Sequence, residues 1–130
     1  MPISWREALT GRWAVLVYSD PYTVAELERA MVEILAHAIS APPFRLLVDR
    51  RHCQAPTPAF VKHIAALLDQ HRERVAGGHV AMVTSDEVGF GAARMTEIMV
   101  EVQGVPCTLR AFRDWAEAER WLDDGHGSSV

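Results

Sequence analysis

The apolar residues of this sequence change their spacing repeatedly along the chain. Short apolar runs bounded by turn residues alternate with longer segments in which apolar residues recur every third or fourth position. The short runs predict strands at residues 13–18, 44–48, 80–84 and 108–112. Ile3-Ser4-Trp5, before the Thr10-Gly11 turn, predicts an edge strand that forms a hairpin with residues 13–18.

Four segments with helical spacing follow the hairpin and the later strands. A capping box from Thr23 to Glu26 opens the first, which Ser40 and two prolines end. Thr57 and Pro58 open the second, and Gly77-Gly78 ends it. Asp114 opens the last, which ends before Gly125. The third spans about residues 86–102, and its spacing predicts a buried face of Val88, Ala92, Met95, Met99 and Val102.

The order of these elements predicts an α/β domain in which helices pack on a sheet with parallel central strands. The hairpin adds an antiparallel pair, so we expect a mixed β-sheet of four or five strands with four helices. Residues 1–124 are predicted to form a single domain, with a flexible tail at 125–130. The edge strand at Ile3 to Trp5 has to be covered or blunted, which makes a homodimer one expectation.

Composition narrows the classes of partner. The 130 residues carry a net charge of -4, which argues against nucleic acid as the main partner. No apolar run is long enough for a membrane span, and the first residues lack the apolar core of a signal peptide, so the expected location is the cytoplasm. Cys53 and Cys107 match no zinc-ligand spacing, and we expect no cofactor.

The best candidate site is the rim beyond the carboxyl ends of the parallel strands, where ligands bind in open α/β sheets. Asp49, Arg50, Arg51, Ser85 and Asp86 follow two of these strands. The arginines, with Arg45 and Arg94 near them, form a candidate clamp for a carboxylate or phosphate. Ion pairs with Asp49, Asp86 or Glu87 are an equally good interpretation, and Ser85 is a natural helix cap.

Three patterns imitate functional motifs without meeting their requirements. Gly89 to Arg94 resembles a dinucleotide-binding glycine motif, but four residues separate it from the preceding strand, and close packing of the helix on the sheet explains its glycines. His52-Cys53 lacks a geometry for nucleophilic catalysis. His63 and His71 are two helical turns apart and cannot share a metal ion by themselves.

The pattern of apolar residue types also resembles a known family. The matching segments are 44–50, 78–83, 91–95 and 105–122. Together they are similar to the SpoIIAA-like branch of STAS domains (sulfate transporter and anti-sigma-factor antagonist), a bacterial group also grouped with lipid-binding CRAL-TRIO folds. The similarity spans about residues 3–123. It implies a STAS-like mixed sheet with four helices, in agreement with the periodicity.

The resemblance also implies where regulation is expected. Phospho-regulated STAS domains carry an Asp-Ser-Ser-Gly-like segment at the start of the second helix, and phosphorylation of a serine there breaks partner binding. The corresponding stretch here, residues 54–60, contains no Asp, Ser or Gly. Thr57 is its only hydroxyl, and helix capping already explains that residue. The phosphoserine motif is therefore missing.

Three functions compete on these grounds. The first is a non-enzymatic regulatory or protein-interaction domain that presents a helix surface to an unidentified protein partner, with Thr57, Phe90 and Arg94 joining the candidate rim. The alternative is a CRAL-TRIO-like module that binds a small lipophilic or amphipathic ligand. Its pocket would be lined by Met82, Met95, Met99, Phe90 and Trp115, unless these are ordinary core residues. The third is an enzyme that uses Asp49, Arg50, Ser85 and Asp86.

Overall fold

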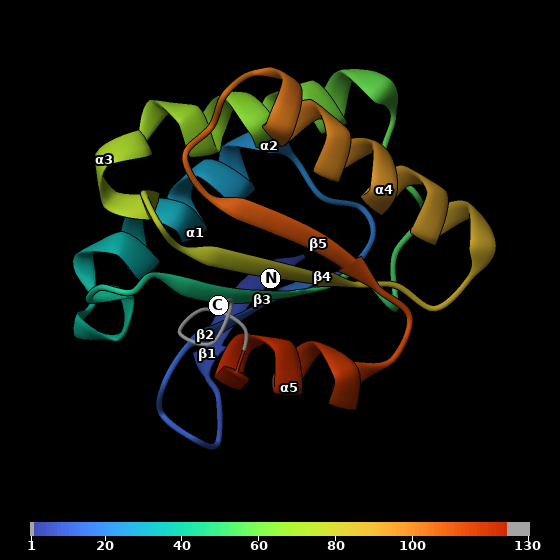
Figure 1. The fold of residues 1–130 in the computed structure, drawn as a ribbon. Coiled ribbons are helices and arrows are strands. Elements are labelled where there is room, and N and C mark those ends of the chain that lie inside the picture. The colour runs from blue at the N-terminus through green and yellow to red at the C-terminus, as the bar shows by residue number, and fades with distance from the viewer. Residues whose placement is uncertain (1, 125–130) are drawn as a thin grey trace.

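The computed structural model describes residues 2–124 and shows an α/β fold (Figure 1). The strands are β1 (Ile3–Glu7), β2 (Ala14–Tyr18), β3 (Arg45–Asp49), β4 (His79–Val83) and β5 (Thr108–Phe112). The helices are α1 (Val24–Ala36), α2 (Pro58–Gln70), α3 (Arg72–Val75), α4 (Glu87–Val102) and α5 (Trp115–Asp124), with a short 3-10 helix at Ala38–Ser40. The predicted flexible tail, 125–130, lies outside the described residues.

The five strands form one mixed sheet in the order β1-β2-β3-β4-β5. β1 pairs antiparallel with β2, with Ile3 opposite Tyr18, and the remaining neighbours are parallel. The N-terminal hairpin, the edge position of β1 and the mixed sheet predicted from the sequence are therefore confirmed. β5 forms the opposite edge of the sheet.

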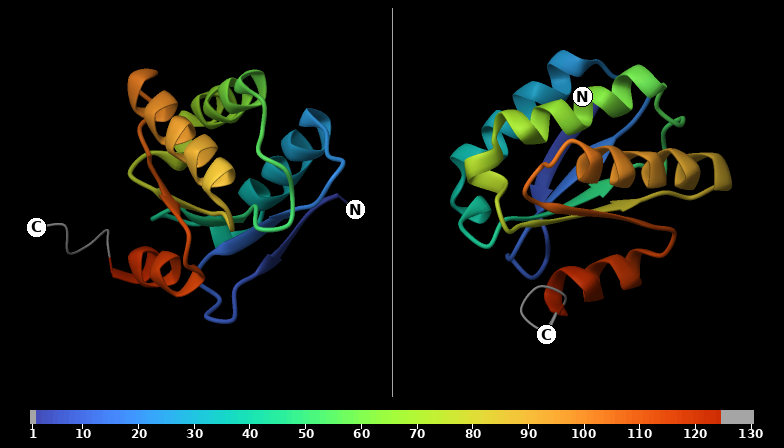
Figure 2. Two further views of the ribbon diagram at one scale, coloured as in Figure 1. Left: turned by 90° about the vertical axis from the view of Figure 1, so that its right-hand side faces the viewer. Right: turned by 45° about the horizontal axis from the view of Figure 1, so that its top comes forward.

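The two faces of the sheet carry different numbers of helices. α1, α2 and α4 cover one face and α5 lies on the other (Figures 1 and 2). Leu46 and Val48 of β3 join the core under the three helices, whereas Leu47 joins a smaller core with Trp13 and Leu122. Because successive side chains of a strand point to opposite faces, a strand covered on both sides is apolar throughout.

Three of the predicted helix starts agree with the structure, and one is shifted. The Thr23 hydroxyl and the Glu26 side chain form the capping box of α1. Thr57 caps α2 by accepting a hydrogen bond from the Phe60 N–H, and Asp114 accepts one from the Ala116 N–H at the start of α5. The cap of α4 is Asp86 rather than Ser85, because Asp86 Oδ1 accepts from the Gly89 N–H at 2.7 Å.

The structure corrects two further expectations about helices. The single helix predicted before Gly77 is divided at His71, so that Val75 belongs to the separate helix α3. The predicted buried face of α4 is correct only in part: Met99 is half-buried and packs against the core, but Val88, Met95 and Val102 are exposed. The residues that α4 buries fully are Ala93, Thr96 and Val100.

No helix within residues 2–124 is both long and apolar enough to cross a membrane.

Candidate functional site

The parallel strands bring Asp49, Arg50 and Arg51 to one end of the sheet, as the sequence predicts. Asp49 ends β3 and pairs with Val83, the last residue of β4. Asp49 and Arg50 are both buried. Successive side chains nevertheless point to opposite faces of the sheet. Arg50 points toward the aromatic rings near α1 and α2, whereas the Asp49–Arg51 pair lies on the side of α5. The two groups therefore do not form one catalytic pair.

Arg50 is held in an aromatic cage on the side of α1 and α2. Its side chain stacks on two tyrosine rings, 4.5 Å from the centroid of Tyr18 and 5.2 Å from that of Tyr22. Its Nη2 donates to the Tyr22 hydroxyl at 2.8 Å and to the Gln54 carbonyl at 2.9 Å. Its Nη1 is buried with no hydrogen-bond partner among the described residues. Phe60 packs edge-on against both tyrosines and closes the cage.

Burial keeps two titratable neighbours of Arg50, Tyr18 and Cys53, in their neutral forms. Burial raises the pKa of the Tyr18 hydroxyl well above its ordinary value, and the Arg50 cation opposes this only in part. Burial also raises the pKa of the half-buried Cys53 thiol. A protonated thiol is a poor nucleophile, and the adjacent His52 is exposed to solvent. The cage is built for packing and hydrogen bonding rather than for nucleophilic attack.

On the opposite face, Asp49 and Arg51 form an ion pair beneath α5. Arg51 Nε lies 3.0 Å from Asp49 Oδ1, and Arg51 Nη2 donates to Oδ2 at 3.1 Å. Burial by itself would raise the pKa of Asp49, but the hydrogen bonds from Arg51 outweigh it and leave the pKa below its ordinary value. The Arg51 guanidinium also stacks on Trp115 at 4.3 Å. The structure therefore shows Arg51 in an ion pair with Asp49, which was one of the two interpretations of the arginines at this rim.

Three of the predicted rim residues have local structural roles. Thr57 and Asp86 cap helices through their side chains. The Ser85 hydroxyl donates to the Arg51 carbonyl at 2.9 Å and so joins the loop after β4 to the loop after β3. Each of these contacts uses the polar group that a catalytic role would need.

The last two candidates, Phe90 and Arg94, lie on α4 beside the carboxyl end of β5, where the Arg113 guanidinium lies 5.8 Å from the centroid of the Phe90 ring. They line an open groove of about 390 Å³ between α4 and the edge strand β5. Arg94 forms an ion pair with Glu97 at 3.6 Å, while Glu97 accepts a hydrogen bond from the Ala111 N–H of β5 at 2.8 Å. Arg45 starts β3, at the other end of the strand from Arg50. The predicted cluster of Arg45, Arg50, Arg51 and Arg94 is therefore not assembled.

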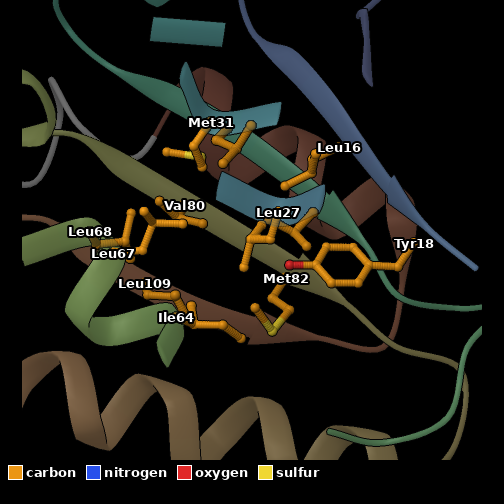
Figure 3. Close-up of a pocket in the computed structure, with 12 residues that line it drawn as sticks. Leu16, Tyr18, Leu27, Met31, Ile64, Leu67, Leu68, Val80, Met82 and Leu109 are labelled. Atoms are coloured by element: carbon orange, nitrogen blue, oxygen red, sulfur yellow. The ribbon is translucent and has the colours of Figure 1, made fainter. Parts of the chain in front are cut away.

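The residues suggested for a lipophilic pocket are also dispersed. Met82 lies in the core beneath the three helices, Trp115 packs on the other face of the sheet, and Met95 is exposed. An apolar cavity next to Met82 and Tyr18 measures about 20 Å³ (Figure 3). This is room for about one water molecule. The structure gives no support to a lipid-binding interior.

The outer face of α4 exposes apolar residues, three of which, Val88, Met95 and Val102, were predicted to be buried. Val88, Met95, Ile98 and Val102 are 73%, 49%, 56% and 75% exposed. With the exposed Gly91 they follow the spacing three, four, three and four, so they share one side of the helix. We call these five residues the α4 stripe. Scattered exposed apolar residues are ordinary, but a continuous stripe along four helical turns is typical of an interaction surface.

Three residues that hold Arg50 in place were missing from the predicted rim. Tyr18 ends β2, and the parallel register that pairs Val17 with Asp49 places it beside Arg50. Tyr22 and Gln54 come from loops, and the Gln54 N–H donates to Asp20 Oδ2 at 2.8 Å, which joins those loops. Extending the strand register by one residue would have found Tyr18, but no sequence signal marks Gln54.

A metal centre finds no support at the rim or elsewhere in the described part of the chain. Within residues 2–124, no three His, Cys, Asp or Glu side chains are grouped so that they could hold a metal ion.

Comparison with known proteins supports the fold. No family model matches the chain, and no curated protein matches it in sequence. Among solved structures, it is similar to an uncharacterized protein of the DUF3478 family, with a SpoIIAA-like fold, from Shewanella loihica PV-4. The two share 18% sequence identity with a TM-score of 0.61, over 92% of this chain and 91% of the other. The chain thus adopts the SpoIIAA-like fold that its sequence pattern resembles.

Proposed function

We propose that this chain is a non-enzymatic regulatory or interaction domain of the cytoplasm that binds protein through the outer face of α4. The α4 stripe is the observation that carries the proposal. The apolar side chains of the stripe are exposed to solvent, so their burial contributes nothing to the stability of the isolated domain. A docked protein would bury them and gain that free energy on binding.

Two further observations support a binding role over catalysis. Asp49 is paired with Arg51, and Asp86 caps a helix. Arg50 lies in its cage on the other face of the sheet, with Nη2 already hydrogen bonded. The SpoIIAA-like fold of the solved neighbour is consistent with a STAS-like regulatory role.

Site-specific photo-crosslinking in cells tests this function. A benzophenone amino acid in place of Met95 or Ile98 is expected to form adducts with protein. The same group in place of Lys62, which is exposed on α2, provides the matched control and should form none. Absence of adducts from positions 95 and 98 would contradict the proposal. So would turnover of a substrate by the purified protein that Asp49→Ala or Asp86→Ala abolishes.

A further inference from the structure

The α4 stripe has the spacing of a helix that pairs with another helix. Val88, Met95 and Val102 are seven residues apart, and Gly91 and Ile98 lie between them at the fourth position of each heptad. In heptad notation, Val88, Met95 and Val102 occupy the a positions and Gly91 and Ile98 the d positions, the pattern of helices that pack side by side in a coiled coil. The opposite side of α4, with Ala93, Thr96 and Val100, is already buried against the domain.

We propose that the protein docked on the α4 stripe is a second copy of this chain, with its own α4 running antiparallel. The inference rests on the proposed function and names its partner. It places the dimer contact on α4, not on the edge strand β1 where the sequence pattern suggested one.

The apolar side chains of the stripe are complementary to themselves in this orientation. In an antiparallel pair, the a position of one helix meets the d position of the other. Met95 then packs against Ile98 of the second copy, and the same contact repeats across the two-fold axis. Gly91 meets Val102 of the second copy, and its missing side chain leaves room for the valine. The space beside Gly91 is open, since a β-carbon added there would have no atom outside the helix itself within 4 Å.

Charges beside the stripe favour the antiparallel orientation. Arg94 precedes Met95 and Glu101 precedes Val102, so both lie on the same flank of the stripe and both are exposed. Seven residues separate them, a rise of roughly 10 Å along one helix, which is too far for a direct ion pair. Antiparallel docking sets Arg94 of each copy against Glu101 of the other. Parallel docking would set Arg94 against Met99 of the other copy instead, and would form no such ion pair.

Charge reversal tests this arrangement because the interface is symmetric. We expect sedimentation equilibrium to show a dimer for the wild-type protein. Arg94→Glu and Glu101→Arg should each weaken dimerisation by at least about tenfold, since each replaces two attractive contacts by two repulsive ones. An equimolar mixture of the two variants should recover the dimer, because the reversed charges then face each other. Arg120→Glu, on α5, is the matched control and should leave dimerisation unchanged.

The possible outcomes separate the inference from the proposed function. A wild-type monomer that still crosslinks from position 95 to a different protein overturns the dimer and keeps the binding function. A dimer that survives both reversals overturns the α4 contact. Reversals that dissociate the dimer without recovery in the mixture overturn the antiparallel orientation. Circular dichroism of each variant excludes unfolding as the cause of a lost dimer.

Discussion

At the scale of single residues, Arg50 is unusual because it is only 4% exposed and forms no ion pair with a carboxylate among the described residues. Removing a guanidinium from water is costly unless other groups compensate. Here the two tyrosine rings supply negative faces, and the Tyr22 hydroxyl and the Gln54 carbonyl supply acceptors. Arg50 thereby holds together the segments that follow β2 and β3.

The stability of Arg50→Ala measures this role. We expect the free energy of unfolding to fall by about 2–4 kcal/mol, because the change removes two hydrogen bonds of a charged donor and leaves space between the rings. Urea denaturation gives the difference. Arg120→Ala, an exposed arginine on α5, should change stability by less than about 0.5 kcal/mol. Equal stability of Arg50→Ala and the wild type would show that the cage does not depend on the cation.

The ion pair between Asp49 and Arg51 predicts a dependence on pH. The pKa of Asp49 is lowered in the folded protein from its ordinary value of 3.8, so the ionised carboxylate stabilises the fold. That stabilisation is complete well above pH 3.8 and is lost as the pH falls through the lower folded value. We expect Asp49→Asn to lose about 1–2 kcal/mol at neutral pH, and the difference from wild type to shrink in acid. Urea denaturation at a series of pH values measures it, and a difference that does not change with pH would point to a steric cause.

The candidate residues at the rim show what the sequence could predict at this scale. The ends of parallel strands align, so a strand pattern was enough to bring Ser85, which follows β4, beside Arg51, which follows β3. It did not reveal the division of Asp49 and Arg50 between the two faces of the sheet, although strand alternation implies it. The partners Tyr22 and Gln54 lie in loops, where spacing carries no information about contacts.

At the scale of elements, α4 shows why periodicity can select the wrong face. Apolar residues surround most of this helix, so two different sides have helical spacing. The prediction chose the side with larger side chains. The structure buries the side with Ala93, Thr96 and Val100, and the helix approaches the sheet closely: a β-carbon on Gly89 would lie 3.3 Å from the β-carbon of Thr84. The prediction that glycine lets this helix pack closely on the sheet was therefore correct for Gly89, and the position of Gly89 indicates which side of α4 is buried.

Replacing each glycine of α4 by alanine separates packing from helix propensity. Gly91 faces open space, so Gly91→Ala should stabilise the protein by about 0.5–1 kcal/mol through helix propensity alone. Gly89→Ala gains the same propensity but crowds Thr84 and the Asp86 cap, and we expect it to be at least about 1 kcal/mol less stable than Gly91→Ala. Thermal denaturation of both variants at low protein concentration gives the comparison. Equal effects would contradict the close approach of α4 to the sheet.

At the scale of the whole molecule, the order of strands and helices was enough to predict the fold class. Because β2 to β5 are parallel and follow one another across the sheet, right-handed crossovers place α1, α2 and α4 on one face, and α5, which follows the last strand, covers the other (Figures 1 and 2). The interaction surface was not predictable in the same way. An exposed apolar stripe and a buried one have the same spacing, and only the packing of the complete molecule distinguishes them.

The main core is densely packed, and this bears on the lipid-binding alternative. The cavity beside Met82 measures about 20 Å³, so the wild-type protein should show no rise in melting temperature with benzene or indole and no bound lipid in native mass spectra. Met82→Ala should enlarge this cavity, cost about 2–5 kcal/mol of stability, and create binding of benzene with a measurable rise in melting temperature. Val32→Ala, on the exposed side of α1 and outside the α4 stripe, is the control and should neither lose this stability nor bind benzene. A lipid that copurifies with the wild-type protein would contradict this account, because a filled core has no room for it unless the helices separate from the sheet.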